Sequence, residues 1–369
     1  MKAQLEVKTF FILLLILCSC KDDDSEKPSS TVGESQRNFE MGFTTWPYGP
    51  TQIDVDSTYL LIHANGDCYT EHLDNKIPWK ALIDSTPFPA EFLNDLTGRK
   101  GQKPTNKSLI LSVSLLNGSR ADLIEDYDGS VPNYTQLNDS TIEIAYFDYL
   151  DYLIEELNPS YLIAALEVNE LLEKDATKWA EYKLLIAAVK ARLKAKYPTL
   201  MISESITLHN WYEPGLSTLT NDQQEVNNYF STQDFAAISF YPFIAGLSNE
   251  AGFNEAFDFL NTHVTIPIAF SETGHLAEDL IIPNLNTNIK SDPIQQQQYM
   301  DILLNNAQNN DYKFITWWTY RDYDKLWNTF PANVKDIGKI WRDTGIEDEK
   351  GAKRPAYSSW NSFYKMARK

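Results

Sequence analysis

The stretch Tyr161-Leu-Ile-Ala-Ala-Leu-Glu-Val-Asn-Glu170 decides how the rest of the sequence is interpreted. It is a short, continuous apolar run between two helical patterns, which is typical of a strand buried in a parallel sheet. The run ends in the polar pair Asn169-Glu170, so a carboxylate is expected at the rim of the sheet. Ile266-Pro-Ile-Ala-Phe270 has the same design and runs into Ser271-Glu272-Thr273-Gly274. The sequence therefore predicts two buried strands that each deliver one glutamate at the carboxyl end.

Strand and helix signals alternate from residue 39 to the C-terminus, with no repeat at a fixed short period. The predicted strands are 39–46, 67–73, 108–115, 161–170, 200–207, 235–240, 266–270 and 313–318. Eight strands alternating with helices over roughly 330 residues predict one (β/α)₈ barrel, and a doubly wound open sheet is the structural alternative.

Helical signals fill the intervals between these strands. A helix over 57–65 is expected behind a cap at Asp56, and another over 79–96 with an interruption at two prolines. A capping box opens at Ser140 and leads into an aromatic-rich helix. One long helix is predicted to carry its apolar face on Trp179, Tyr182, Ile186, Val189 and Leu193. Further helices are expected around 253–260, over 292–309 and after Pro355.

Charge narrows the classes of ligand. The 369 residues carry a formal net charge of -19, which argues against nucleic-acid binding because phosphate backbones require a basic surface. A neutral or cationic substrate fits better. The 43% hydrophobic and 13% aromatic content is enough for a sizeable core.

The N-terminus has the pattern of a targeting segment. A basic start precedes an apolar run over 10–17 that is too short to span a bilayer. Leu17-Cys-Ser-Cys20 resembles the lipobox of bacterial lipoproteins, which predicts cleavage before Cys20 and its lipidation. An ordinary secretory signal is the alternative. Lys21-Asp-Asp-Asp24 resembles the acidic export tag of surface lipoproteins in Bacteroidota, so we expect a lipid-anchored protein on the outer membrane, at the cell surface.

These signals predict a signal peptide (1–19), a lipidated tether (20–37) and one (β/α)₈ barrel domain (38–369). The tether is rich in Asp, Ser, Glu, Lys and Pro. Only Cys68 is left as a free thiol, so we expect no disulfide and no zinc-thiolate site, and Cys68 is expected to fill apolar space. No cofactor and no metal are predicted, and the chain is expected to act as a monomer.

Residues at the carboxyl ends of the predicted strands form the candidate site, because barrel enzymes place their active sites there. The candidates are aromatic, amide, histidine and carboxylate side chains: Trp46, Tyr48, Glu71, His72, Asn117, Arg120, Asn169, Glu170, His209, Asn210, Trp211, Tyr241, Glu272, Trp317, Trp318 and Tyr320. They contain no glycine loop that could cradle a phosphate and no cluster at metal-ligand spacing.

These motifs resemble the clan A glycoside hydrolases, which are retaining (β/α)₈ enzymes. The resemblance rests on an Asn-Glu pair ending strand four, Tyr241 within Ser239-Phe-Tyr-Pro-Phe243 ending strand six, and Glu272 ending strand seven. Within the clan, Phe-Tyr-Pro-Phe and Glu-Thr-Gly look most like family 53, the endo-β-1,4-galactanases. Strand two departs from the clan pattern, because it offers Glu71 and His72 where the clan often has an arginine. Arg120 is a candidate substitute.

By this resemblance Glu170 is the general acid/base and Glu272 the nucleophile. Retention takes two displacements, with one carboxylate attacking the anomeric carbon and the other donating and then accepting a proton. Retaining enzymes hold these two groups about 5–5.5 Å apart. The resemblance also implies that Asn169 binds the sugar 2-hydroxyl and that Tyr241 positions Glu272.

For several other residues the sequence allows either a structural or a functional role. Glu167 lies three residues before Glu170 and is predicted to point to the opposite face, and Glu204 is mid-strand, so neither is expected in the site. His72, His209 and Arg120 are each candidates for sugar contact or for a structural hydrogen bond or ion pair.

Six of the nine tryptophans fall at or after predicted strand ends: Trp46, Trp79, Trp211, Trp317, Trp318 and Trp327. Flat aromatic rings cover the apolar faces of sugar rings, so these residues predict a rim for a polysaccharide. One of the adjacent pair Trp317 and Trp318 is expected to pack in the barrel. Trp211 would lie opposite the others and give an open groove.

The leading hypothesis is therefore a surface-tethered, endo-acting retaining glycosidase for a plant-type, galactan-like β-linked polysaccharide. The alternative is a glycan-binding lipoprotein on a degenerate barrel that cuts no bond.

Overall fold

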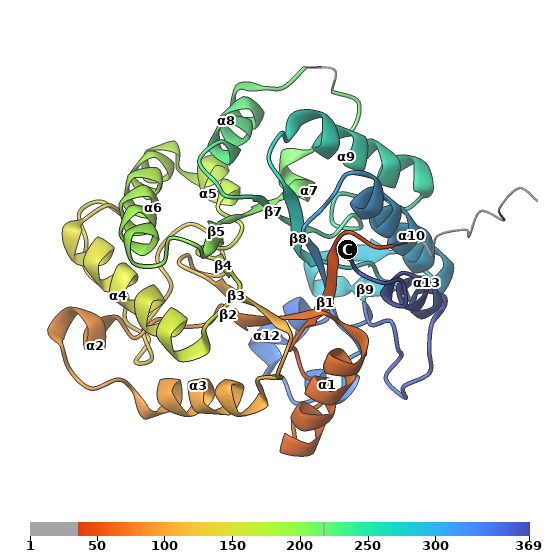
Figure 1. The fold of residues 1–369 in the computed structure, drawn as a ribbon, viewed down its shortest axis with the longest axis horizontal. Coiled ribbons are helices and arrows are strands. Elements are labelled where there is room, and N and C mark those ends of the chain that lie inside the picture. The colour runs from red at the N-terminus through yellow and green to blue at the C-terminus, as the bar shows by residue number, and fades with distance from the viewer. Residues whose placement is uncertain (1–35, 217) are drawn as a thin grey trace, which may run out of the picture. The chain divides into compact units, whose positions relative to one another are not determined.

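The computed structural model describes residues 36–216 and 218–369, and these residues form a closed (β/α)₈ barrel (Figure 1). Every pair of neighbouring strands in the main sheet is parallel, in the order β5-β4-β3-β2-β1-β11-β8-β7-β6. The strands are β1 (Glu40–Thr44), β2 (Cys68–Leu73), β3 (Ser108–Val113), β4 (Tyr161–Ile163), β5 (Met201–Ser203), β6 (Ser205–Thr207), β7 (Ala236–Phe240), β8 (Ile268–Thr273) and β11 (Phe314–Trp317).

The two ends of that order, β5 and β6, are successive pieces of one strand interrupted at Glu204, so the sheet closes on itself. Glu204 is fully buried. Its carboxylate accepts a hydrogen bond from the Tyr229 hydroxyl at 2.6 Å and lies 3.3 Å from the Lys190 ammonium. Because both partners come from helices outside the sheet, α6 (Ala176–Lys196) and α8 (Asn221–Phe230), Glu204 is directed away from the barrel interior.

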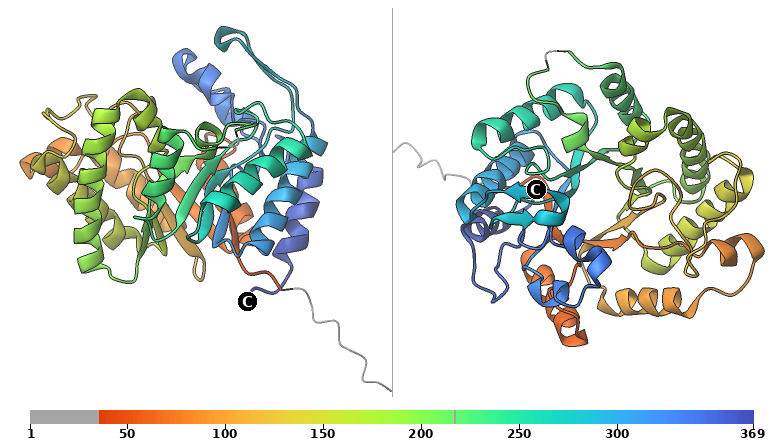
Figure 2. Two further views of the ribbon diagram at one scale, coloured as in Figure 1. Left: turned by 90° about the horizontal axis from the view of Figure 1, so that it is seen from above. Right: turned by 180° about the vertical axis from the view of Figure 1, so that it is seen from behind.

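Helices cover the outside of the barrel (Figures 1 and 2). The helices of the described residues are α1 (Gln52–Asn65), α2 (Trp79–Asp84), α3 (Ala90–Gln102), α4 (Ser140–Leu157), α5 (Asn169–Lys174), α6 (Ala176–Lys196), α7 (Leu208–Trp211), α8 (Asn221–Phe230), α9 (Glu250–His263), α10 (Pro293–Asn309), α11 (Asp324–Trp327), α12 (Ala332–Gly338) and α13 (Pro355–Tyr364); α5, α7 and α12 contribute residues to the carboxyl end of the barrel. A small antiparallel hairpin of β9 (Leu280–Ile282) and β10 (Thr287–Ile289), joined by the 3₁₀ turn Pro283–Leu285, follows β8.

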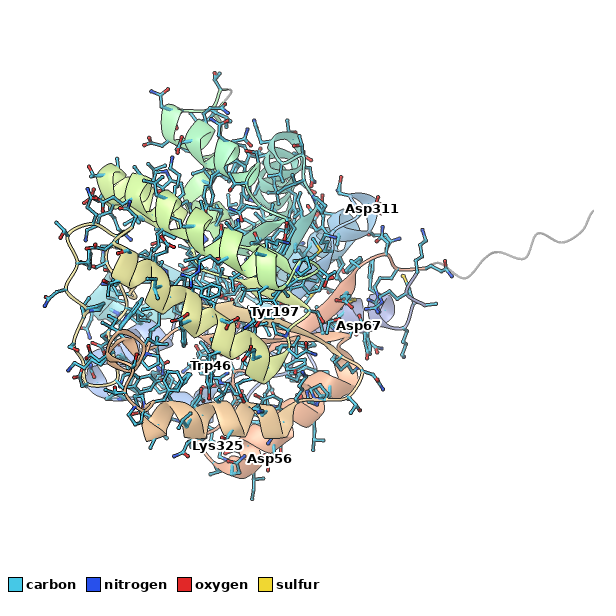
Figure 3. The ribbon with its side chains drawn as sticks, turned by 60° about the vertical axis from the view of Figure 1, so that its left-hand side comes forward. Trp46, Asp56, Asp67, Tyr197, Asp311 and Lys325 are labelled. Atoms are coloured by element: carbon cyan, nitrogen blue, oxygen red, sulfur yellow. The ribbon has the colours of Figure 1, made fainter. Side chains whose placement is uncertain are left out.

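The helices follow local sequence rules with one correction. α1 begins at Gln52 instead of residue 57, because Thr51 and Asp54 form a capping box that the expected cap at Asp56 overlooked. Asp54 is further held by the Lys325 ammonium at 2.6 Å (Lys325 is labelled in Figure 3). The prolines predicted to interrupt the second helix do separate α2 from α3.

The long helix α6 confirms the predicted apolar face. All five predicted residues are buried, and the Trp179 ring stacks on Tyr182 at a centroid separation of 5.6 Å. Burial of each such side chain stabilises the fold by about 1.5–3 kcal/mol. Cys68 is also buried, as predicted, and burial raises the pKa of its thiol.

The described chain begins and ends at the same place. Arg37 and Arg368 form a parallel bridge, and the Arg37 guanidinium pairs with Asp67 at 2.5 Å (Asp67 is labelled in Figure 3). The left view of Figure 2 shows the C-terminus at one end of the barrel, while hairpin β9–β10 and α12 rise from the other end. The predicted signal peptide and the lipidation site Cys20 lie outside the described residues. Within them, no helix is long and apolar enough to cross a membrane.

Candidate active site

A cavity of ≈ 610 Å³ opens at the carboxyl ends of the strands. Eight predicted site residues line it: Trp46, His72, Arg120, Glu170, His209, Tyr241, Glu272 and Trp318. The remaining wall contains residues that sequence reasoning missed: Asp74, Gly118, Glu167, Ile244, Tyr323, Phe330, Val334, Ile337, Gly338, Ile340 and Trp341. The barrel thus brings most of the predicted residues together, and it adds a third glutamate and an apolar wall.

Glu272 lies near the end of β8, where the register with the neighbouring strands β7 and β11 shifts after Phe270. Its Oε1 accepts a short hydrogen bond from the Tyr241 hydroxyl, and its Oε2 lies 3.6 Å from His72 Nε2. Gly274 lies just beyond, where an added Cβ would come within 2.6 Å of the Trp318 carbonyl oxygen, so this position of the Glu-Thr-Gly motif requires glycine. Burial and the nearby charge of Glu167 raise the pKa of Glu272 well above its ordinary value.

Glu167 corrects the prediction that it points away from the site. The β4 ladder ends at Ile163, and the chain then turns through a positive φ of 53° at Glu167 itself. Alternation along the strand therefore no longer applies, and the side chain enters the cavity. Its Oε2 accepts from Arg120 Nη2 at 2.7 Å and Nε at 3.1 Å, and its Oε1 accepts from Ser239 Oγ at 2.8 Å.

These partners set both the position and the charge of Glu167. Burial alone would raise the pKa of Glu167, but the Arg120 guanidinium outweighs it and holds the pKa below its ordinary range. Ser239 is the residue directly opposite Glu272 in the β7–β8 pair. Since neighbouring strands lie about 4.8 Å apart, the Glu167 carboxylate reaches the immediate surroundings of Glu272.

Glu170 also lines the cavity, from the first turn of α5. Its carboxylate pairs with Lys174 one helical turn later, at 3.0 Å. Burial, followed by the charge of Glu167, raises the pKa of Glu170. Glu170 therefore lies in the cavity wall, as the sequence predicted, but its ion-pair partner is an exposed lysine on its own helix.

Asn169 does not line the cavity. It is buried, and its amide oxygen accepts from Thr207 N at 2.8 Å and Thr207 Oγ1 at 3.1 Å, while its amide nitrogen donates to Thr207 O. These bonds tie the exit of strand four to the end of strand five. The expected contact with a sugar hydroxyl stays a prediction, and in this structure the side chain is engaged with the backbone and hydroxyl of Thr207.

Three polar residues complete the floor of the cavity. Burial lowers the pKa of both His72 and His209, so both rings are neutral at pH 7. The Nδ1 atoms of both rings are buried and have no hydrogen-bond partner in the described chain. Arg120 has both of the roles considered for it, because it lines the cavity and also forms the ion pair with Glu167.

Three tryptophans face the cavity and leave polar atoms unused. Trp46 packs against Trp318 with ring centroids 5.2 Å apart, and Trp341 packs against Tyr241 at 5.9 Å. The indole Nε1 groups of all three tryptophans are buried without a partner among the described residues. Buried polar groups are normally hydrogen-bonded, so these donors mark the cavity as a site for a ligand with several acceptors.

The other predicted tryptophans do not form a rim. Trp211 is only 1% exposed, packs against Phe230 and Phe259, and donates its indole N–H to the Gln223 carbonyl. The predicted groove with a stacking position at Trp211 is therefore wrong. Trp79 and Trp317 are also buried, with indole bonds to Ile124 O and Thr344 O. The burial of Trp317 confirms that one of the adjacent pair packs in the barrel.

Two further candidates lie outside the cavity. Glu71 is buried between β2 and the helices, where it accepts from Tyr59 at 2.7 Å and Arg99 at 2.5 Å. Trp327 lies on α11 and donates to the Lys335 carbonyl. Carboxylates that could surround a cation occur in two clusters, Asp322 with Asp324 and Asp343, and Asp322 with Glu278 and Glu349. Arg342 and Arg354 already pair with both clusters, so neither offers an uncompensated cation site.

Comparison with known proteins establishes the fold. A GH5_18 protein from Bifidobacterium longum subsp. longum ATCC 55813, in complex with Manb1-4GlcNAc, matches 90% of this chain and 80% of its own at TM-score 0.61 and 15% identity. GH5_18 from Streptomyces cattleya, in complex with GlcNAc, matches 91% and 83% at TM-score 0.63 and 12% identity. The exo-beta-1,4-mannosidase Op5Man5 from Opitutaceae bacterium strain TAV5 matches 89% and 59% at TM-score 0.62 and 12% identity. No protein-family model and no curated protein matches the sequence. At these identities the shared property is the (β/α)₈ barrel.

Proposed function

We propose that this chain is a retaining glycoside hydrolase that cleaves a neutral β-linked glycan. The observation that carries the proposal is the pair of half-buried glutamates, Glu167 and Glu272, in the cavity at the carboxyl end of a (β/α)₈ barrel. Each lies in a cavity with partnerless indole and imidazole nitrogens, which suits a ligand rich in hydroxyl groups. Double displacement requires two carboxylates that face each other across the cavity at close range.

Glu272 is assigned as the nucleophile. Tyr241 fixes one of its oxygens by donating a hydrogen bond, which also stabilises the ionised carboxylate that must attack the anomeric carbon. Its second oxygen carries no hydrogen bond from the described residues, with His72 at 3.6 Å, and is therefore available for attack.

Glu167 is assigned as the acid/base in place of the predicted Glu170. Its carboxylate reaches Ser239 opposite Glu272, whereas Glu170 is paired with Lys174 on the wall. Glu170 remains the alternative donor, and its raised pKa is the property that favours it. The single mutants of both residues separate these assignments.

The two carboxylates share a proton at neutral pH, because burial and mutual repulsion oppose a double negative charge. In the empty cavity the raised pKa of Glu272 keeps this proton on the nucleophile. A bound glycosidic oxygen can accept a hydrogen bond only from a protonated Glu167. Substrate binding therefore favours transfer of the proton to Glu167 and ionisation of Glu272, the state in which the first displacement proceeds.

Two observations bear on which sugar the substrate contains. The structural neighbours include an exo-β-1,4-mannosidase and proteins in complex with Manβ1-4GlcNAc and GlcNAc, which favours a β-mannoside. The motifs after strands six and seven favour a β-1,4-galactan. We place β-mannosides first, because the neighbours align with about nine-tenths of this chain and the motifs are a few residues each.

Cleavage inside a polysaccharide stays a prediction. Its main support was a stacking position at Trp211, and that side chain is buried. On one side the cavity is bounded by an apolar wall from Phe330, Val334, Ile337, Ile340 and Trp341. Products released early from a polysaccharide decide the question, because monosaccharide alone indicates cleavage at chain ends.

The test is hydrolysis by purified residues 36–369. Aryl β-mannosides, β-1,4-mannan oligosaccharides, Manβ1-4GlcNAc and β-1,4-galactan should be offered in parallel, and the anomer formed first should be followed by proton NMR. We expect release of the β-anomer from at least one substrate. Release of the α-anomer would contradict the double displacement. Binding without hydrolysis of any of these would favour the glycan-binding alternative.

We also propose that the protein is lipidated at Cys20 and held at the outer membrane. The support is the Leu-Cys-Ser-Cys sequence after a short apolar run. A diacylglycerol together with an amide-linked chain anchors firmly, whereas one chain binds marginally. Cys20→Ala should move the protein from the membrane fraction to the soluble fraction, and unchanged fractionation would contradict the proposal.

A further inference from the structure

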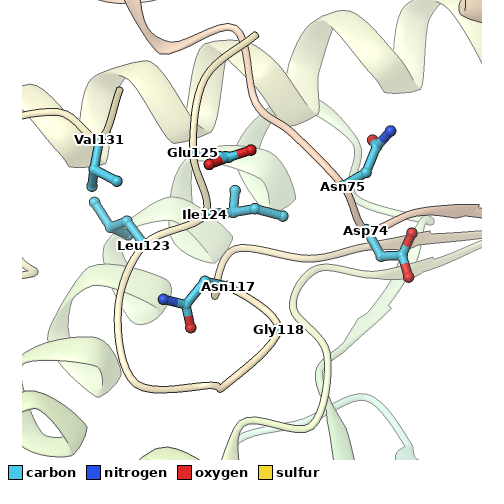
Figure 4. A pocket seen from close by; sticks show the side chains of 8 residues that line it. All are labelled: Asp74, Asn75, Asn117, Gly118, Leu123, Ile124, Glu125 and Val131. Carbon is cyan, nitrogen blue, oxygen red and sulfur yellow. The ribbon is translucent and has the colours of Figure 1, made fainter. Parts of the chain in front are cut away.

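A second hollow of ≈ 280 Å³ adjoins the catalytic cavity (Figure 4). It is lined by Asp74, Asn75, Asn117, Gly118, Leu123, Ile124, Glu125 and Val131. Asp74 and Gly118 line both spaces, so the hollow lies directly beside the site of the two glutamates. Figure 4 shows Asp74 and Asn75 on one side, Asn117 on the facing loop and the Ile124 side chain between them.

The hollow is built on a hydrogen-bonded loop. Leu116 and Leu123 form an antiparallel bridge, and Asn117 N donates to Asp122 O at 2.8 Å. The loop is joined to the end of strand two through Ile77 N, which donates to Glu125 O at 3.1 Å. The shape is therefore fixed by backbone bonds before any ligand arrives, which lowers the entropy cost of binding.

The side chains of the hollow have unused polar groups above an apolar base. The carboxylates of Asp74 and Glu125 and the Asn75 amide are exposed, and none of them has a side-chain hydrogen bond within the described residues. Leu123 and Ile124 are buried beneath them. A sugar unit presents hydroxyls around its edge and C–H groups on its faces, so it can engage both kinds of surface.

Charge restricts which sugar the hollow accepts. Two carboxylates line it, and no lysine or arginine does among the residues that the structure describes. In the adjoining cavity the arginine that lines the wall, Arg120, is paired with Glu167. A uronic acid or a sulfated sugar would meet like charge with no compensating cation, whereas hydroxyl groups can donate to both carboxylates.

We propose that this hollow is a second sugar-binding site for an uncharged unit of the same glycan. The identity of its ligand rests on the proposed glycosidase function. The substrate accordingly has at least two sugar units, one at the glutamate pair and its neighbour in the hollow, with Asp74 between the two spaces. Glu125 and Val131 are the residues to change, because they line the hollow and not the catalytic cavity.

The experiment measures binding in the Glu272→Gln background by calorimetry, with mannose, β-1,4-mannotriose and β-1,4-galactotriose as probes. Glu125→Ala should weaken binding of the preferred trisaccharide about fivefold to tenfold, which corresponds to one lost hydrogen bond. Val131→Trp, which fills the hollow, should weaken it at least as much. Glu125→Gln retains a hydrogen-bond acceptor and should stay within about twofold of the parent.

Glu250→Ala is the matched control, since Glu250 is an exposed glutamate at the start of α9. It should leave all affinities unchanged, and binding of mannose should be unaffected in every variant. Equal trisaccharide affinity in Glu125→Ala, Val131→Trp and the parent would overturn the proposal, as would failure of both trisaccharides to bind. Because binding is measured without turnover, failure of the hollow is distinguishable from failure of the hydrolase assignment, which is read from the unmutated chain.

Discussion

The two candidate catalytic glutamates are positioned in different ways. Glu272 lies within β8, opposite Ser239 of β7 and just beyond an irregularity in the strand register, and its carboxylate accepts a hydrogen bond from the Tyr241 hydroxyl. Glu167 lies four residues beyond the end of β4, at a positive φ, and is held by Arg120 and Ser239. One carboxylate is thus carried by a strand and held by one tyrosine hydroxyl, whereas the other lies beyond its strand and is held by an arginine and a serine. The second arrangement should be the more sensitive to mutation of its neighbours.

The largest effect is expected for Glu272→Ala. Without a nucleophile no glycosyl-enzyme forms, so kcat should fall by about 10⁴-fold or more on activated and natural substrates alike. The measurement is kcat/KM on an aryl glycoside and on an oligosaccharide. A variant that keeps full activity on the aryl glycoside would contradict the assignment of Glu272.

The next effect separates Glu167 from Glu170. Glu167→Ala should lower kcat/KM on natural substrates about 10²- to 10⁴-fold, the range for general acid catalysis. It should largely spare the first step on substrates with an activated leaving group, which need no proton, and then stall at deglycosylation. Glu170→Ala, the matched change on the same wall, should cost less than tenfold. The reverse ranking would restore Glu170 as the acid/base.

Arg120→Ala tests whether the ion pair between Arg120 and Glu167 sets the pKa of Glu167. Arg120 lowers the pKa of Glu167, so removal of the guanidinium should raise that pKa and shift the pH profile of kcat/KM toward higher pH. We expect a loss of about tenfold to a hundredfold at neutral pH. Ser239→Ala removes one neutral bond and should cost less. If the pH profile of kcat/KM does not shift in Arg120→Ala, Glu167 does not depend on its neighbours more than Glu272 does.

The smallest expected effect is on stability. Because the pKa of Glu272 is raised in the folded state, its contribution is fully favourable below the unfolded pKa of about 4.3. Stability is lost as pH rises through the higher folded pKa, since folding then opposes ionisation. Glu272→Gln should therefore match the parent Tm near pH 4 and exceed it by about 2 °C or more at pH 8. Equal Tm values at both pH values would contradict the raised pKa.

The fold could be predicted because its signals are local and repeated. Each buried strand is an apolar run bounded by helical patterns, and eight such runs leave few architectures. The helix start at Gln52 was missed because two acceptable caps lie five residues apart, and only the Thr51–Asp54 pair forms reciprocal bonds. The strand predicted over 266–270 is β8 (Ile268–Thr273), which continues three residues further because the ladder resumes after an irregularity beyond Phe270.

The candidate site was predicted less completely, for reasons that particular residues show. Glu167 was set aside by extending strand alternation past Ile163, where the ladder had already ended. Trp211 follows a strand end, but a place in the sequence does not say which way a side chain points, and this one packs under α8 and α9. Trp341 lies in a connection without strand or motif signals, so only the folded chain brings it to Tyr241.

The junction of Arg37 with Arg368 has a consequence for the topology of the chain. Arg37 N donates to Ala367 O at 2.8 Å and Lys369 N donates to Arg37 O at 2.9 Å, so the two ends of the barrel domain are already adjacent. A short peptide could join them into a ring, and the ring could be reopened at the exposed turn between α2 and α3. Circular permutants of this kind keep every ladder pair of the barrel, because closure of the sheet does not depend on which residue is synthesised first. The order of strands in the gene and the order of strands in the barrel are therefore separable properties of this protein.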